Sequence, residues 1–170
     1  DNEPTYSYHG YAQSDLYKVD PRYGTNSWFK ELVLESHRRG LKVIKDEVPN
    51  HWSSKHWMIQ DLPTKTWIHQ FDQFTRSSYR TSTQMDPYAA PTDHSASADG
   101  WFDTSMPDMN QSNPLLLTYL IQNTIWWVEY ACLDGLRVDT YSYNDKDAIA
   151  TWTKAIMEEY PKLNMVGEVW

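Results

Sequence analysis

The 170-residue sequence contains one cysteine and no apolar run close to the roughly 18 residues that a membrane helix needs. A single cysteine excludes a disulfide framework within the chain and a zinc site built on cysteines. Cys132 stands in an apolar helical stretch, so we expect a buried, inert thiol. We expect no membrane insertion, while periplasmic, extracellular and cytoplasmic locations all stay compatible with the sequence.

Positive charge is also scarce. There are 15 lysines and arginines against 23 aspartates and glutamates, and the net charge of −8 argues against a nucleic-acid partner, which requires a basic face. A glycine-rich phosphate loop and a cysteine–histidine ligand set are missing, which argues against a nucleotide- or metal-dependent α/β enzyme. Five histidines without metal-binding spacing are expected mostly at the surface: His9, His37, His56, His69 and His94.

Aromatic residues are abundant instead. They make up 15% of the chain, with nine tryptophans and twelve tyrosines. Flat rings with a polar edge suit stacking on sugar rings as well as ordinary core packing. Composition alone favours core packing for most of them.

Hydrophobic periodicity predicts helices that alternate with strands. Helices are expected over 27–39, 115–131 and 145–159, and strands over 41–45, 136–139 and 164–170. Such alternation predicts right-handed β–α units and a parallel sheet, and therefore an α/β fold.

Residues 52 to 110 interrupt this alternation. They show no regular period, no repeat and no low-complexity run. Connections between such units usually have about 2–6 residues, and the many aromatic residues here favour a folded insertion over disorder. The chain is therefore divided into 1–51, 52–110 and 111–170, with the middle range as an inserted irregular domain.

Two charged residues mark the strand expected at 136–139. Alternation in Gly135-Leu136-Arg137-Val138-Asp139 places Arg137 and Asp139 on one face and the apolar pair on the other. An arginine beside a carboxylate keeps it ionised, which suits nucleophilic attack. A plain ion pair at a strand end is the alternative, and these two residues alone favour it.

Glu168 follows Asp139 by 29 residues (168 − 139), about the length of one β–α repeat. Parallel strands in register would bring both carboxyl groups to the carboxyl end of the sheet, where sites form in such folds. Gly167, Val169 and Trp170 are expected to raise the pKa of Glu168 and keep it protonated as an acid. A solvated glutamate after the strand is the competing interpretation.

A third polar group, Asp46, Asn50 and His51, lies at another predicted strand end. The pattern is compatible with a metal site, a substrate-binding edge or a helix-capping turn. One histidine with oxygen donors is a weak signal for a transition metal.

Five segments together resemble glycoside hydrolase family 13, the α-amylase superfamily. They are Tyr8-His9-Gly10-Tyr11, Asp46-Glu47-Val48-Pro49-Asn50-His51, Met106-Pro107-Asp108-Met109-Asn110, Gly135-Leu136-Arg137-Val138-Asp139 and Gly167-Glu168-Val169-Trp170. They occur in the family's order and spacing, and the resemblance covers nearly the whole chain. It implies part of a (β/α)₈ TIM barrel, from the loop after the second strand to the fifth strand, with 52–110 as the protruding B domain.

The resemblance also implies the catalytic roles. Asp139 is then the nucleophile, Glu168 the general acid/base and Arg137 the partner of the nucleophile. Two carboxylates that act by double displacement lie about 5–5.5 Å apart and retain the anomeric configuration. The family's third catalytic aspartate, in a later His-Asp motif, is expected beyond Trp170.

Substrate-binding roles follow from the same resemblance. His51 is implied to hydrogen-bond the sugar beside the scissile bond, Tyr11 to stack on that sugar, and Asp46 to order the site from below. His9 and Gln13 are weaker candidates for the same sugar-binding wall.

The segment that begins with Met106-Pro107 resembles the neopullulanase and cyclomaltodextrinase branch of the family. This implies cleavage of α-1,4 bonds in maltooligosaccharides, cyclodextrins or pullulan, with transglycosylation or α-1,6 specificity as alternatives. A non-catalytic relative that binds sugar or a partner is the other alternative, because a fold does not determine function. Expected partners are the glucan, the rest of the same barrel and, as an open option, a second copy in a homodimer.

No cofactor is required for this chemistry, and calcium is an open question. Many family members carry a histidine four residues after the nucleophile, whose backbone helps to hold a calcium ion, and Tyr143 stands at that position here. Asn50 and Asp108 can still supply oxygen ligands.

Overall fold

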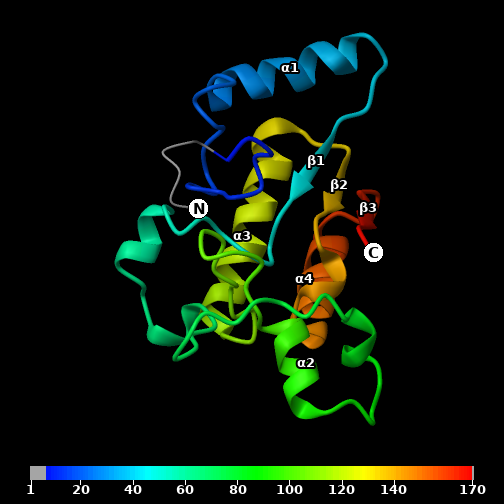
Figure 1. The fold of residues 1–170 in the computed structure, drawn as a ribbon. Helices are drawn as coiled ribbons and strands as arrows, with labels where there is room; N and C mark the ends of the chain where they lie inside the picture. The colour runs from blue at the N-terminus through cyan, green and yellow to red at the C-terminus, as the bar shows by residue number, and fades with distance from the viewer. Residues whose placement is uncertain (1–6, 170) are drawn as a thin grey trace.

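Three short parallel strands organise the computed structural model, which describes residues 7–169 (Figure 1). β1 spans Ile44–Glu47, β2 Gly135–Val138 and β3 Asn164–Gly167. Their order in the sheet is their order in the chain, and both pairings are parallel. The predicted parallel sheet is confirmed, although β1 begins later than expected. Residues 1–6 of the predicted first segment, and Trp170 at the end of the predicted last strand, lie outside the described residues.

The long helices match the prediction to within one residue at each end. They are α1 (Asn26–Arg38), α3 (Pro114–Ala131) and α4 (Lys146–Glu159). Each begins at a polar cap, because the side chains of Thr25, Asn113 and Asp145 accept hydrogen bonds from backbone N–H groups of the first turn. Within residues 7–169, none of the helices combines the length and apolar character that a membrane crossing needs.

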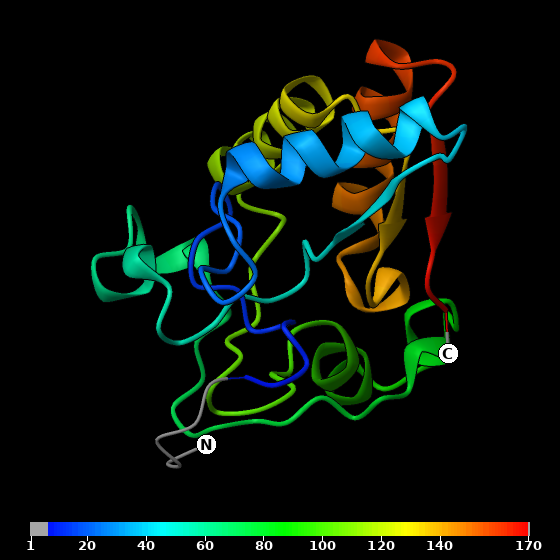
Figure 2. The same ribbon diagram turned by 90° about the horizontal axis from the view of Figure 1, so that it is seen from above.

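One core joins the helices to the sheet. In both views α4 lies next to β2 and β3 (Figures 1 and 2). The fully buried side chains Leu116, Leu136, Trp152 and Ile156 belong to this core. The apolar residues of β2 face the core, so Arg137 and Asp139 are left for the other face, as the alternation predicts.

The middle range is folded, with short helices and little regular structure. It contains three 3₁₀ turns (Trp57–Gln60, Lys65–Trp67 and Thr81–Gln84) and the helix α2 (Pro91–Ala98), which Figure 1 draws at the bottom in green. Two isolated bridges, His51 to Asp108 and Ile68 to Met109, tie its beginning to its end. Its buried Trp52, Trp67 and Met109 join the main core, and the division of the chain at 52 and 110 stays a prediction.

Two side chains differ from the sequence expectation. Cys132 is exposed rather than buried, because α3 ends at Ala131 and Cys132 turns the chain in a left-handed conformation, with φ of 59°. His56 is fully buried rather than at the surface, with its ring 4.2 Å from the ring of Trp52. Burial lowers the pKa of His56 to about 4, so this imidazole is neutral at neutral pH.

Shortening the central strand's core side chain should destabilise the protein strongly. Leu136 is completely buried in β2, so Leu136→Ala leaves a cavity and should cost about 2–5 kcal/mol of unfolding free energy. Denaturant unfolding of the full-length protein measures this. Lys154→Ala is the control, since its side chain is 74% exposed on α4 and the change should stay within about 0.5 kcal/mol. Equal effects of the two variants would contradict the described core.

Candidate active site

The sheet register brings the two predicted catalytic carboxylates side by side. Val138 pairs with Gly167, so Asp139 and Glu168 are the next residues on adjacent strands. The backbone ladder continues past the strand ends: the N–H of Glu168 donates to the carbonyl of Val138 at 2.8 Å, and the N–H of Asp139 donates to that of Glu47 at 2.8 Å. The predicted meeting of these residues at the carboxyl end of the sheet is therefore confirmed.

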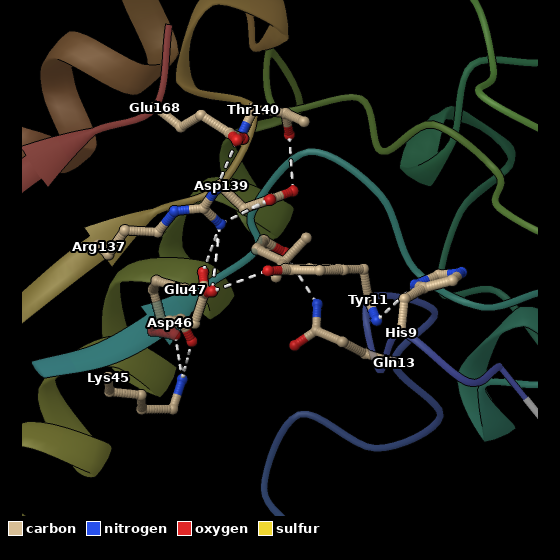
Figure 3. Close-up of polar contacts among 11 residues, drawn as sticks. His9, Tyr11, Gln13, Lys45, Asp46, Glu47, Arg137, Asp139, Thr140 and Glu168 are labelled. Carbon is tan, nitrogen blue, oxygen red and sulfur yellow. Dashed lines mark hydrogen bonds and ion pairs between the residues drawn. The ribbon is translucent and has the colours of Figure 1, made fainter.

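Arg137 lies at the centre of this group (Figure 3). Its Nη1 donates to Oδ1 of Asp139 at 2.7 Å and to both carboxylate oxygens of Asp46 at 2.9 and 3.1 Å. Its Nη2 pairs with Oε1 of Glu168 at 2.6 Å. One guanidinium thus contacts three carboxylates, which exceeds the plain ion pair that the two strand residues alone suggested.

Asp139 is 5% exposed, and burial raises the pKa of its carboxyl group. The charge of Glu168 acts in the same direction, whereas hydrogen bonds from Arg137 and Thr140 and the charge of Arg137 lower the pKa. The pKa of Asp139 ends above the ordinary aspartate value. The sequence interpretation considered only the arginine; burial at the strand end outweighs it.

Arg137 itself remains charged. Burial alone would lower the pKa of its guanidinium, but the hydrogen bonds and charges of Asp46 and Asp139 raise it above the usual value. A fixed positive charge therefore sits between the carboxylates.

The surroundings of Glu168 differ from those predicted. The expected apolar environment is not formed by the neighbours that the structure describes, because Val169 is 70% exposed and Gly167 is also exposed. Instead, the carboxylate contacts Arg137 and accepts a hydrogen bond from the backbone N–H of Thr140 at 3.0 Å. Gly167 and Val169 therefore do not enclose Glu168 in this chain, while the third expected neighbour, Trp170, lies outside the described residues and its contribution stays a prediction.

The segment before α1 supplies one wall of the site. The hydroxyl of Tyr11 donates to Oδ2 of Asp46 at 3.2 Å, and its ring centre lies 5.8 Å from the Arg137 guanidinium. His9 stacks on Tyr11 with ring centres 5.7 Å apart. Asp46 thus holds both Arg137 and Tyr11 from below. Gln13 instead donates to the backbone carbonyl of Val48 at 2.9 Å and does not line the cleft.

A cleft of about 330 Å³ opens onto these residues. It is lined by His9, Tyr11, His51, Tyr79, Phe102, Met106, Arg137, Asp139, Thr140 and Glu168. Both predicted catalytic carboxylates therefore face a common space, together with Tyr11, His51 and His9 from the predicted sugar-binding set.

His51 is a neutral, buried member of the cleft wall. Burial lowers the pKa of His51 to about 4, the charge of His9 acts in the same direction, and the backbone of Tyr11 offsets part of the shift. Its ring meets the Phe102 ring edge-on, with centres 5.0 Å apart. A neutral imidazole can exchange hydrogen bonds with sugar hydroxyl groups without adding charge to the site.

Three cleft residues were missed by the sequence interpretation, and a fourth, Met106, was named only as part of a family segment without a role in the site. Thr140 directly follows Asp139, and that adjacency was the available signal. Tyr79 and Phe102 come from the middle range, where their rings stack with centres 5.8 Å apart. The aromatic richness of that range pointed to it as a whole, but its irregular path gave no spacing rule for individual positions.

The two predicted calcium ligands lie behind the cleft wall. Asp108 is 1% exposed; its Oδ1 accepts from the Asn50 amide at 3.1 Å and its Oδ2 contacts Nδ1 of His69 at 2.7 Å. Burial raises the pKa of Asp108 to about 7, although the hydrogen bond and charge of His69 oppose this. Oδ1 of Asn50 is buried and lacks a hydrogen-bond partner, which a cation would supply.

Asn50 and Asp108 by themselves are too few donors for a calcium site. Calcium takes six to eight oxygen ligands, and both oxygens of Asp108 already have partners. Residues 7–169 contain no cluster of three or more histidine, cysteine, aspartate or glutamate side chains that could hold a metal. Tyr143, at the position of the family's histidine, packs its buried ring against Phe102.

Comparisons with known proteins agree with the geometry. Alpha-amylase 3 of Dictyoglomus thermophilum is 31% identical over 180 aligned residues, which cover 98% of this chain and 34% of that protein. The cyclomaltodextrinase of Thermoanaerobacter pseudethanolicus is 28% identical over 173 residues, covering 98% of this chain and 28% of that protein. The solved α-amylase of Geobacillus thermoleovorans, complexed with acarbose, superposes with a TM-score of 0.78 at 33% identity, covering 96% of this chain and 34% of the other.

This chain spans about a third of the length of these relatives, 28–34% in the three cases. The sequence model of the family described as "Alpha amylase, catalytic domain" matches residues 2–170. Because that match covers nearly the whole chain, the chain belongs to the alpha-amylase catalytic domain family.

Proposed function

We propose that the protein containing this chain is a retaining glycoside hydrolase that cleaves α-1,4-glucosidic bonds in maltooligosaccharides, cyclodextrins or pullulan. The observation that carries the proposal is the Arg137 guanidinium, which holds Asp139 and Glu168 at one cleft by contacts of 2.7 and 2.6 Å. The relatives named alpha-amylase and cyclomaltodextrinase support the substrate class.

Each carboxylate has a part in a double displacement. Asp139 attacks the anomeric carbon while Glu168 donates a proton to the leaving glycosidic oxygen, and a covalent glycosyl-enzyme forms. Glu168 then takes a proton from water, which attacks the same carbon and releases Asp139. Retaining enzymes hold the two groups about 5–5.5 Å apart, whereas inverting enzymes need about 6.5–9.5 Å for an intervening water. Contact with a single guanidinium favours the closer spacing.

The remaining cleft residues bind and order the sugar. Tyr11 offers its ring face for stacking, and His51 its neutral imidazole for hydrogen bonds. Asp46 keeps Arg137 and Tyr11 in place through the bonds described above, and His9 supports Tyr11 from behind.

The proposed setting is a (β/α)₈ barrel in which this chain contributes the segment from the second β–α loop to the fifth strand, with 52–110 as the B domain. Three parallel strands in sequential order support it, as does the coverage of about a third of the relatives. The rest of the barrel would then supply a third catalytic aspartate. Transglycosylation or α-1,6 cleavage is the alternative specificity.

Product analysis of the full-length enzyme tests the proposal. Starch, β-cyclodextrin and pullulan are incubated separately, and proton NMR follows the anomeric signals of the first products. We expect cleavage of at least one glucan, with the α-anomer appearing before mutarotation. An initial β-anomer would show inversion, and absence of cleavage in all three would support the non-catalytic alternative.

A further inference from the structure

Thr140 is held in an unusual backbone conformation between the two carboxylates. Its φ of 46° and ψ of 39° lie in the left-handed region, which β-branched residues rarely occupy because of steric strain. The residue is 6% exposed, so the strained conformation is enclosed by neighbouring groups. Backbone strain of this kind persists only where the surroundings enforce it, and it concentrates at functional sites.

The surroundings of Thr140 do enforce it. The carbonyl of Thr140 accepts hydrogen bonds from Nδ2 of the buried Asn144 at 3.1 Å and from the N–H of Tyr143 at 2.9 Å. On the other side, the N–H of Tyr141 donates to the backbone carbonyl of Glu168 at 3.1 Å. The turn after β2 is thus bonded to itself and to the end of β3.

The conformation directs two donors at the two carboxylates. The backbone N–H of Thr140 donates to Oε2 of Glu168 at 3.0 Å, and its hydroxyl donates to Oδ2 of Asp139 at 3.1 Å. Arg137 contacts the opposite oxygens, Oδ1 of Asp139 and Oε1 of Glu168. Each carboxylate is therefore held from two sides, by Arg137 and by Thr140.

We infer that Thr140 is a positioning residue that fixes the nucleophile and the acid/base relative to each other, an inference that rests on the proposed function. Its hydroxyl donates to the carboxylate form of Asp139 and so opposes the effect of burial. The other charged or titratable groups around Asp139 are Arg137 on β2, Asp46 on β1 and Glu168 after β3, together with the cleft-wall residues His9, Tyr11, His51 and Tyr79.

Two matched substitutions in the full-length enzyme separate the hydroxyl from the shape of the side chain. Thr140→Val keeps the branching and the backbone preference but loses the donor, whereas Thr140→Ser keeps the donor. We expect kcat/KM of Thr140→Val to fall by about tenfold or more, mainly through kcat, since a hydrogen bond to a charged group is lost. The acid limb of its pH profile should move to higher pH, while Thr140→Ser stays within about threefold of wild type with an unmoved limb. Thr140→Ala, smaller and equally without a donor, should behave like Thr140→Val and serves if the valine variant folds poorly.

A measurement without substrate separates this inference from the proposed function. The pKa of Asp139 is followed by NMR with ¹³C-labelled aspartate, using Asp139→Asn to assign the signal, and should rise in Thr140→Val but not in Thr140→Ser. If the pKa of Asp139 responds in this way but the full-length protein cleaves no glucan, the proposed function is overturned, while the effect of Thr140 on Asp139 is retained. An active enzyme in which Thr140→Val changes neither the rate nor the Asp139 titration would overturn the role of Thr140.

Discussion

Replacing Asp139 with asparagine in the full-length enzyme is expected to lower kcat by on the order of 10⁴-fold or more, as for other catalytic nucleophiles. The neutral amide cannot form the glycosyl-enzyme or stabilise the positive charge that develops on the sugar. Asparagine has nearly the same shape as aspartate and keeps an oxygen that can accept from Arg137, which donates to Asp139 at 2.7 Å. Glucan binding should therefore survive, within about tenfold in Kd.

Steady-state rates and calorimetric titration with a maltooligosaccharide measure the two effects. Asp61→Asn is the matched control, because it makes the same chemical change at an exposed position outside the cleft, and both its turnover and its binding should be unchanged. Turnover of Asp139→Asn within 100-fold of wild type would refute the nucleophile assignment. Loss of binding together with loss of turnover would point instead to a collapsed site.

The arrangement of the proposed catalytic pair could be predicted because it depends on regular structure. Alternation along β2 placed Arg137 and Asp139 on one face, and the length of a β–α repeat placed Glu168 on the next strand in register. The observed pairing of Val138 with Gly167 follows from these periods. Positions that depend on strand register can thus be predicted from residue type and spacing.

Positions that depend on irregular backbone could not be predicted from the sequence. A positive φ at Thr140 is not encoded in its residue type, which disfavours it; the hydrogen bonds of Asn144 and Glu168 impose it. Tyr79 and Phe102 are 23 residues apart (102 − 79) in a range without periodicity, and tertiary contacts bring their rings together. Cys132 is exposed because it is the residue after the last residue of α3, Ala131, and takes the left-handed conformation that ends the helix.

Glu168→Gln should separate the acid step from the nucleophilic step. For natural glucans, whose leaving group needs a proton, we expect kcat to fall by about 10²–10⁴-fold, the usual contribution of general acid–base catalysis. A maltosyl fluoride needs little protonation of its leaving group, so Asp139 can still attack it in the variant. Water activation also depends on Glu168, hence the covalent glycosyl-enzyme should accumulate and be detectable on Asp139 by mass spectrometry.

Azide provides the decisive readout, because this anion attacks without a general base. With Glu168→Gln, azide should accelerate turnover of the fluoride and yield the α-glycosyl azide, since it displaces Asp139 from the face opposite to that carboxylate. In an Asp139→Ala variant the same anion would enter on the side that the nucleophile has vacated and yield the β-glycosyl azide. The NMR configuration of the two products therefore assigns each carboxylate separately. A β-azide from Glu168→Gln would exchange the two roles. Arg137 would then contact the nucleophile through Glu168 and the acid/base through Asp139.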